Sequence, residues 1–227
     1  MDFLNDLFRI PLAILPFYLV VIVIAFTVHE FSHAYFANKF GDPTAKLLGR
    51  VTLNPTVHFD FFGILLLLIA GFGWARPVPV NRDNFARPRL MGIVVSIAGP
   101  LSNFVLAIIG SFIYAVLIHT GYIESMTNLK LQEAIATFLY YFSFMNFFLF
   151  LFNLIPLPPL DGYRILEDLV PPKVRAKLQQ WEQWSIFIFL LILFIPALRA
   201  FTIDPIYELT KFLYLNFIQM FLVLLGG

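Results

Sequence analysis

The chain has 227 residues, of which 60% are hydrophobic and only 13% charged, and its mean hydropathy is +0.84. A soluble globular domain carries roughly 25% charged residues, so this composition excludes an ordinary water-soluble protein. Fifteen Lys and Arg against fourteen Asp and Glu give a net charge of +1, which offers no basic surface for nucleic acid. Because the chain has no cysteine, any metal must be bound by His, Asp or Glu.

Long apolar runs follow one another along the chain, each compatible with a membrane-spanning helix of about 20 residues. They cover residues 11–37, 90–119, 132–156, 184–198 and 205–225. The first run continues past Thr27 without a small-residue cleavage site, so we expect a retained helix and not a signal peptide. No polar stretch is long enough for a separate soluble domain. The sequence therefore predicts an all-α polytopic membrane protein with about five transmembrane helices in a single membrane domain, residues 1–227.

A further apolar run, residues 61–74, is shorter and is interrupted by glycines. Its length and its glycines suit a re-entrant segment better than a full span. Runs of β-branched residues closed by turn residues flank it at 49–55 and 76–81. We therefore expect an insertion made of a strand, a re-entrant apolar loop and a second strand.

Positive charge predicts the orientation in the membrane. With 61–74 re-entrant, most Lys and Arg residues fall on one face, namely Lys39, Lys46, Arg50, Arg76, Arg82, Arg87, Arg89, Arg164, Lys173, Arg175 and Lys177. The positive-inside rule makes this face cytoplasmic. We expect an N-terminus outside, a location in the cell (cytoplasmic) membrane, and an active site towards the cytoplasmic side.

Residues 29–33, His-Glu-Phe-Ser-His, form an HExxH motif near the inner end of the first long helix. Residues four apart lie one helical turn apart, so His29 and His33 can bind one metal ion while Glu30 acts as general base. The alternative is a pair of structural histidines with Glu30 as their counter-ion. An ionisable group inside a membrane helix costs roughly 2.5 kcal/mol or more, which favours placement for function and thus the metal site.

A catalytic zinc ion has three protein ligands and one open position, so a third ligand must come from elsewhere. The best candidate is Asp161, in the segment NLIPLPPLDG at residues 153–162. The prolines of this segment cannot continue a regular helix, and the broken backbone would direct Asp161 inward. A second interpretation, compatible with the first, makes Asp161 the N-cap of a helix that begins near Tyr163.

Three motifs in order resemble the site-2 protease family of intramembrane zinc metalloproteases: HEFSH at 29–33, AGPLSN at 98–103 and NLIPLPPLDG at 153–162. The resemblance covers residues 11–170 and implies a three-helix catalytic core there, followed by additional C-terminal transmembrane helices in 171–227. It implies one Zn2+ per chain held by His29, His33 and Asp161, with Glu30 as catalytic acid/base. It also makes Asn153 a candidate for substrate binding or oxyanion stabilisation. The chain resembles a compact member without PDZ or CBS domains.

The predicted reaction is hydrolysis of a peptide bond in or next to the transmembrane helix of a single-span protein in the lipid bilayer. The substrate helix must unwind, and an extended peptide would then pair with a strand edge at Val51 or Val78. Two alternatives are a metal or proton transporter and a non-catalytic relative that binds membrane helices. The sequence leaves open the substrate's identity and whether the chain forms oligomers.

Three other polar residues are weaker candidates for the site. His58 could approach the site, but an interfacial structural histidine is favoured. Asn103 lies four residues after Gly99, a spacing that allows close helix packing, and packing is favoured over catalysis. His119 falls at the opposite end of the membrane and is excluded as a ligand.

Overall fold

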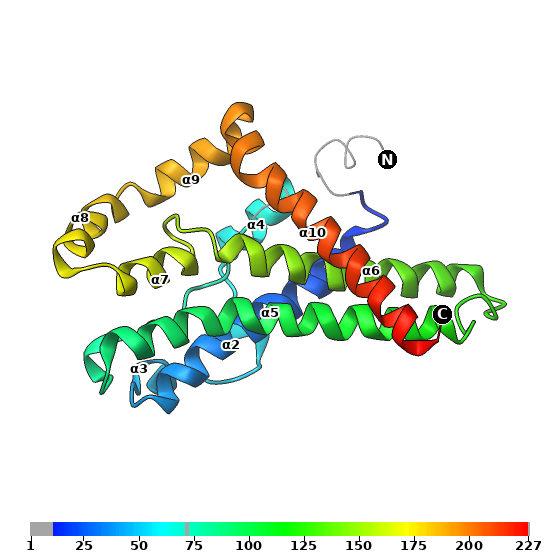
Figure 1. Ribbon diagram of the computed structural model, residues 1–227, viewed down its shortest axis with the longest axis horizontal. Coiled ribbons are helices and arrows are strands. Elements are labelled where there is room, and N and C mark those ends of the chain that lie inside the picture. The colour runs from blue at the N-terminus through cyan, green and yellow to red at the C-terminus, as the bar shows by residue number, and fades with distance from the viewer. Residues whose placement is uncertain (1–10, 71–72, 227) are drawn as a thin grey trace.

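Four long helices build the protein: α2 (Leu15–Lys39), α5 (Pro88–His119), α6 (Leu129–Asn153) and α10 (Pro196–Leu225). The computed structural model describes residues 11–70 and 73–226, and within them these four are the helices long and apolar enough to cross a membrane. Helices α5 and α6 run antiparallel, and α2 and α10 each pack against both of them (Figure 1). The all-α membrane fold is thus confirmed.

Local chemistry explains where the long helices begin and end. Pro88 lies in the first turn of α5, where its missing N–H leaves no hydrogen bond unmade. Asn128 caps α6, because its side chain accepts the N–H of Leu131 at 3.2 Å. Helix α6 ends at Asn153, shortly before Pro156. These boundaries bring the start of α5 and the end of α6 to the same end of the bundle as the last turns of α2 (Figure 1).

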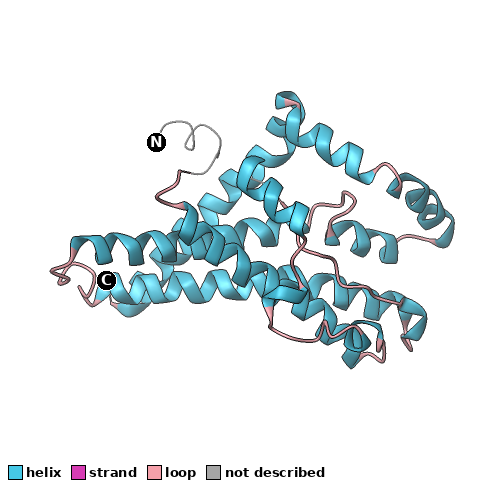
Figure 2. Ribbon diagram, turned by 180° about the vertical axis from the view of Figure 1, so that it is seen from behind, coloured by secondary structure: helices cyan, strands magenta, loops and turns pink. Residues whose placement is uncertain are grey.

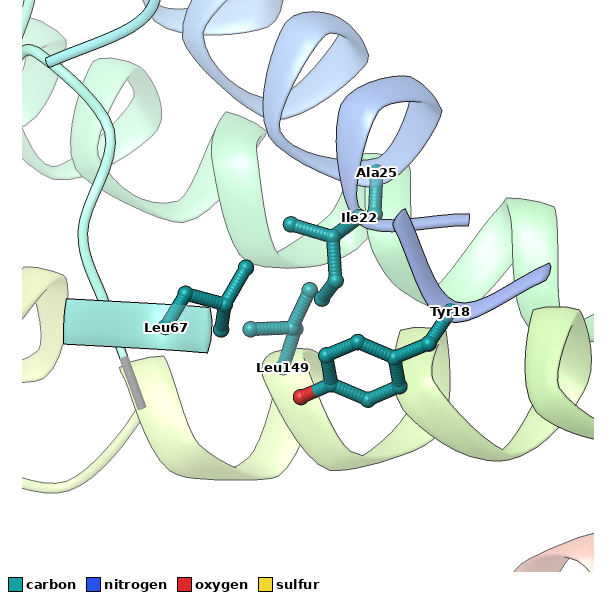
Figure 3. Close-up of a cluster of buried hydrophobic side chains, with 5 residues drawn as sticks. All are labelled: Tyr18, Ile22, Ala25, Leu67 and Leu149. Atoms are coloured by element: carbon teal, nitrogen blue, oxygen red, sulfur yellow. The ribbon is translucent and has the colours of Figure 1, made fainter. Parts of the chain in front are cut away.

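A short helix, α4 (Phe61–Ala70), packs against the bundle from the segment between α2 and α5. Its Leu67 is buried in a cluster with Tyr18, Ile22 and Ala25 of α2 and Leu149 of α6 (Figure 3). The apolar run therefore lies at the level of the spanning helices. The same segment contains α3 (Thr44–Leu47) and two short 3-10 helices, η1 (Pro55–Val57) and η2 (Arg82–Asn84).

The prediction of two strands around this run is wrong. The described residues contain no strand (Figure 2), and one isolated bridge joins Phe59 to Ala75. Residues 51–53 form a bend, and residues 76–80 have no regular secondary structure. A strand needs a neighbour for its backbone hydrogen bonds, and the described flanks pair only at that bridge; the apolar run forms a helix, which satisfies its own backbone.

The insertion nevertheless begins and ends at one place. The N–H of Arg76 donates to the carbonyl of His58 at 2.8 Å, so the chain returns to where it left. Gly63 makes this possible, because a Cβ there would lie 2.1 Å from the carbonyl oxygen of Trp74. Residues 71–72 of the expected apolar run lie outside the described residues.

The C-terminal part also differs from the expected five spans. The run 184–198 is divided into α9 (Ser185–Phe194), which is too short to cross a membrane, and the beginning of α10. Pro196 explains the break, since it has no N–H to continue the hydrogen bonding of α9. The expected link, residues 199–204, is helical and belongs to α10. Before these come α7 (Asp161–Leu169) and α8 (Pro172–Glu182) at the end of the bundle that holds the HExxH motif (Figure 1).

Candidate metal centre

The HExxH motif forms one turn of α2, as its spacing predicts. His29, Glu30 and His33 are 7%, 8% and 7% exposed, although all three side chains are polar. The Nε2 atoms of the two imidazoles are 3.0 Å apart. The two histidines contact α5 through Gly99 and Asn103, so this face of α2 is turned into the bundle.

The third predicted ligand reaches the motif from a distant part of the chain. Asp161 is the first residue of α7, and its Oδ2 lies 3.1 Å from Nε2 of His29 and 3.3 Å from Nε2 of His33. Gly162 allows this approach, because a Cβ there would lie 2.2 Å from the carbonyl oxygen of Leu154. The alternative role as a helix cap is wrong, since Leu160 occupies the cap position and no side chain caps the helix.

The three ligand atoms fit a zinc ion. In a tetrahedral site with ligand distances of about 2.0–2.1 Å, ligand atoms are about 3.3 Å apart, and the separations here are 3.0, 3.1 and 3.3 Å. Among the described residues, His29, His33 and Asp161 are the group of side chains that could hold a metal ion. Oδ2 of Asp161 is buried without a hydrogen-bond donor, as an oxygen reserved for a metal would be.

The Asp161 carboxyl is held in its ionised form. Burial by itself raises its pKa, but the neighbouring His33 and His29 side chains lower it by more, so the pKa lies well below the usual value. A carboxylate ligand must be deprotonated to bind a metal. Asp161 therefore meets this requirement at neutral pH.

Each imidazole has a partner on its other nitrogen. Nδ1 of His33 donates to the carbonyl of Val95 at 2.7 Å, and Nδ1 of His29 lies 2.7 Å from Oδ1 of Asn103. The sequence favours packing over catalysis for Asn103 and allows it a hydrogen bond across the helices, and the structure places such a bond at His29. Gly99, one turn earlier on α5, lies so close that a Cβ would be 2.3 Å from Nε2 of His33. Both histidines are thus turned with Nε2 towards Asp161.

Glu30 has partners from the insertion that the sequence did not identify. Its Oε2 accepts the N–H of Val78 at 2.9 Å. The buried Arg50 donates to the carbonyl of Arg76, and burial lowers its pKa while the negative charge of Glu30 raises it. The polar groups of residues 50 and 76–78 therefore lie around the carboxylate, and only the folded insertion brings them there.

Two sequence candidates make the hydrogen bonds described for them with groups other than His29, His33 and Asp161. The amide of Asn153 donates to the carbonyl of Leu149 in its own helix at 2.9 Å. His58 is fully buried, and its Nε2 donates to the carbonyl of Thr52 at 2.8 Å. His58 therefore holds the turn before η1. Residue Asn146 was missed by the sequence reasoning, although a polar residue inside an apolar helix is itself a signal.

Comparison with known proteins identifies the family of the chain. A sequence model of peptidase family M50, the site-2 protease family, matches residues 17–196. The chain is 51% identical to the protein named zinc metalloprotease YwhC of Bacillus subtilis (strain 168) over 195 residues, 86% of this chain and 87% of that protein. It is 29% identical to the protein named zinc metalloprotease Rip2 of Mycolicibacterium smegmatis over 228 residues, 96% of this chain and 82% of that protein.

A third relative is a zinc metalloprotease of Methanocaldococcus jannaschii, 30% identical over 169 residues, 74% of this chain and 37% of that protein. No solved structure matches the chain. These relationships do not favour the transporter alternative. With the family match covering most of its length, the chain belongs to peptidase family M50 and is an intramembrane zinc metalloprotease.

Proposed function

We propose that His29, His33 and Asp161 hold the single zinc ion and that Glu30 is the general acid/base. The observation that carries this assignment is the meeting of two Nε2 atoms and one unpartnered carboxylate oxygen within 3.3 Å of one another. Zinc bound there would supply Lewis acidity, which polarises the scissile carbonyl and makes a water molecule acidic near neutral pH.

The contacts of Glu30 suit proton transfer. Because Oε2 accepts the N–H of Val78, the carboxylate is fixed in one orientation and its Oε1 is left for a water proton. Glu30 then passes that proton to the leaving amide nitrogen, so that one residue serves as base and then as acid. The positive charge of Arg50 attracts the carboxylate from the side of the insertion.

The substrates of this family are membrane-embedded proteins. We propose a single-span substrate, because one helix can unwind at the site without disturbing other spans. The predicted strand edge at Val51 is absent, and Pro77 and Pro79 have no N–H while that of Val78 is used by Glu30. Pairing along this edge therefore has few donors. Asn153, at the end of α6 beside the NLIPLPPLDG turn, remains our candidate for substrate binding or oxyanion stabilisation.

We propose the whole chain as a single membrane domain, with residues 11–170 as the catalytic core and 171–227 as an addition that contributes α10. The protein is an integral membrane protein. We place it in the cytoplasmic membrane with α7 and α8 on the cytoplasmic side. The basic residues of these helices, Arg164, Lys173, Arg175 and Lys177, support this orientation.

The test is cleavage of a panel of single-span membrane proteins by the full chain, purified in detergent with its metal content measured. Glu30→Gln should lower the cleavage rate by about 10²–10⁴-fold, because it removes the proton-transfer group, and should still contain about one zinc per chain. His29→Ala should lose the metal. Glu124→Gln, an exposed carboxylate in the turn after α5, is the matched control and should cleave normally.

The outcomes separate the alternatives. Zinc bound without any Glu30-dependent cleavage would support the transporter or the helix-binding protein. Native protein without zinc would contradict the ligand assignment. Removal of zinc with a chelator should stop cleavage, and added zinc should restore it.

A further inference from the structure

A chain of hydrogen bonds leads from His29 away from the metal centre, through α5 and into α6. Nδ1 of His29 is 2.7 Å from Oδ1 of Asn103, whose Nδ2 donates to Oδ1 of Asn146 at 2.9 Å. Nδ2 of Asn146 in turn donates to the carbonyl of Phe142 at 2.8 Å. Three helices are thus connected through two amide side chains.

The acceptors at the two ends of this series of hydrogen bonds fix the orientation of every group in it. The carbonyl of Phe142 can only accept, so the NH2 group of Asn146 faces it and Oδ1 faces Asn103. The NH2 group of Asn103 likewise donates to the carbonyl of Ala25 at 3.2 Å. Oδ1 of Asn103 therefore points to His29, which must donate from Nδ1. Its Nε2 is then left with the lone pair that a metal ligand needs.

Both amides are fully buried within spanning helices. A polar group in such a place is costly unless its hydrogen bonds are made, and here every one of these amides has partners. Ala107 of α5 and Phe147 of α6 belong to an apolar cluster in the same contact between the helices. The amide pair therefore lies where the contact between α5 and α6 adjoins His29.

We propose that Asn103, supported by Asn146, is a positioning residue of the zinc site. It sets the tautomer of His29 and aims Nε2 at the position shared with His33 and Asp161. His33 is set separately by the carbonyl of Val95, so the two histidines are positioned by different groups. This inference rests on the proposed role of His29 as a ligand.

The experiment measures the zinc affinity of the full chain in detergent by competition with a chelator, without any need for a substrate. Removing an outer hydrogen-bond partner of a metal-ligating histidine typically weakens binding about 10–100-fold. We expect that loss for Asn103→Ala and a smaller loss for Asn146→Ala, which removes the support behind it.

Two serines provide matched controls. Ser111 on α5 and Ser143 on α6 are also fully buried, and neither hydroxyl oxygen has a hydrogen-bond partner. Ser111→Ala and Ser143→Ala should leave zinc affinity unchanged. Cobalt(II) in place of zinc gives a second readout, because its visible absorption reports ligand geometry; the spectrum should change in Asn103→Ala and not in the serine variants.

A purely structural role gives a different pattern. Asn103→Ala would then lower the unfolding temperature of the zinc-free protein while binding zinc and cobalt as the native chain does, and the proposal would be overturned. If His29→Ala kept full zinc affinity, the failure would be that of the proposed function, because His29 would not be a ligand. Asn146→Ala tests the same chain from α6 should Asn103→Ala not fold.

Discussion

At the scale of single residues, the metal centre depends on the absence of a side chain at Gly99. A Cβ at this position would lie 2.3 Å from Nε2 of His33 and 2.7 Å from Cε1 of His29, closer than real contacts allow. The glycine therefore lets α5 lie against both imidazoles. The same close approach brings Asn103, one turn later, within hydrogen-bond distance of His29.

We predict that Gly99→Ala weakens zinc binding by about tenfold or more, since forcing a methyl group into a packed site costs about 1–3 kcal/mol. Gly110→Ala is the matched control on the same helix. Its Cβ would lie 2.6 Å from Phe142 and Ser143, so it should lower the unfolding temperature while zinc affinity is kept. Chelator competition and thermal unfolding of both variants check this. Equal zinc affinities in the two variants would contradict it.

At the scale of elements, α7 is held at both of its ends. Its first residue, Asp161, belongs to the metal centre, and its last turn carries Glu167 and Asp168, whose side chains are completely buried. Arg82 of η2 reaches Asp168 at 3.0 Å and Glu167 at 4.0 Å. Arg164 pairs with Glu167 at 3.1 Å. The insertion and the ligand-bearing helix are thus joined by buried ion pairs.

Arg82→Met should destabilise the protein by about 3–5 kcal/mol, because it leaves buried carboxylates without a main partner. Arg199→Met is the matched control, since Arg199 pairs with Asp204 at 3.3 Å and both side chains are half exposed. Such exposed pairs contribute about 0–1 kcal/mol. Unfolding in detergent, followed by tryptophan fluorescence, measures both changes, and limited proteolysis between α7 and α8 should be faster in Arg82→Met only. The same loss in both variants would refute the buried-pair explanation.

At the scale of the whole molecule, four is an even number of spans, so the beginning of α2 and the end of α10 lie on the same side of the membrane. Helix α10 runs in the same direction as α5, because Phe217 lies 5.9 Å from Phe104 and Phe221 lies 5.3 Å from Phe112, ring centre to ring centre. The C-terminal end of α10 accordingly lies beside the turn between α5 and α6 (Figure 1). A fifth span would have carried it to the opposite face.

Single cysteines can test this arrangement directly, because the chain has none of its own. In intact cells, a membrane-impermeant maleimide should label Glu124→Cys and Gly226→Cys. Lys177→Cys, on exposed α8, should be labelled only after the membrane is opened. If Gly226→Cys, like Lys177→Cys, were labelled only after the membrane is opened, the chain would have five spans. Labelling of Lys177→Cys in intact cells would invert the proposed orientation.

The sequence by itself determined that the protein lies in a membrane and which side chains are the candidate metal ligands. Composition excludes a water-soluble fold, and the spacing of His29 and His33 sets two imidazoles on one helix face whatever surrounds them. The position of Asp161 could also be predicted, since prolines end α6 locally and Asp161 follows them. These features depend on short stretches of chain, which the sequence shows directly.

Only the tertiary structure decided which distant groups support these ligands. His29 and Asn103 are 74 residues apart, and Asn103 and Asn146 are 43 apart, so no local pattern indicates that they meet. The same holds for the expected strands around α4: a strand needs a partner, and whether one is available depends on the packing of the whole insertion. The contact of Val78 with Glu30 arises from that packing as well.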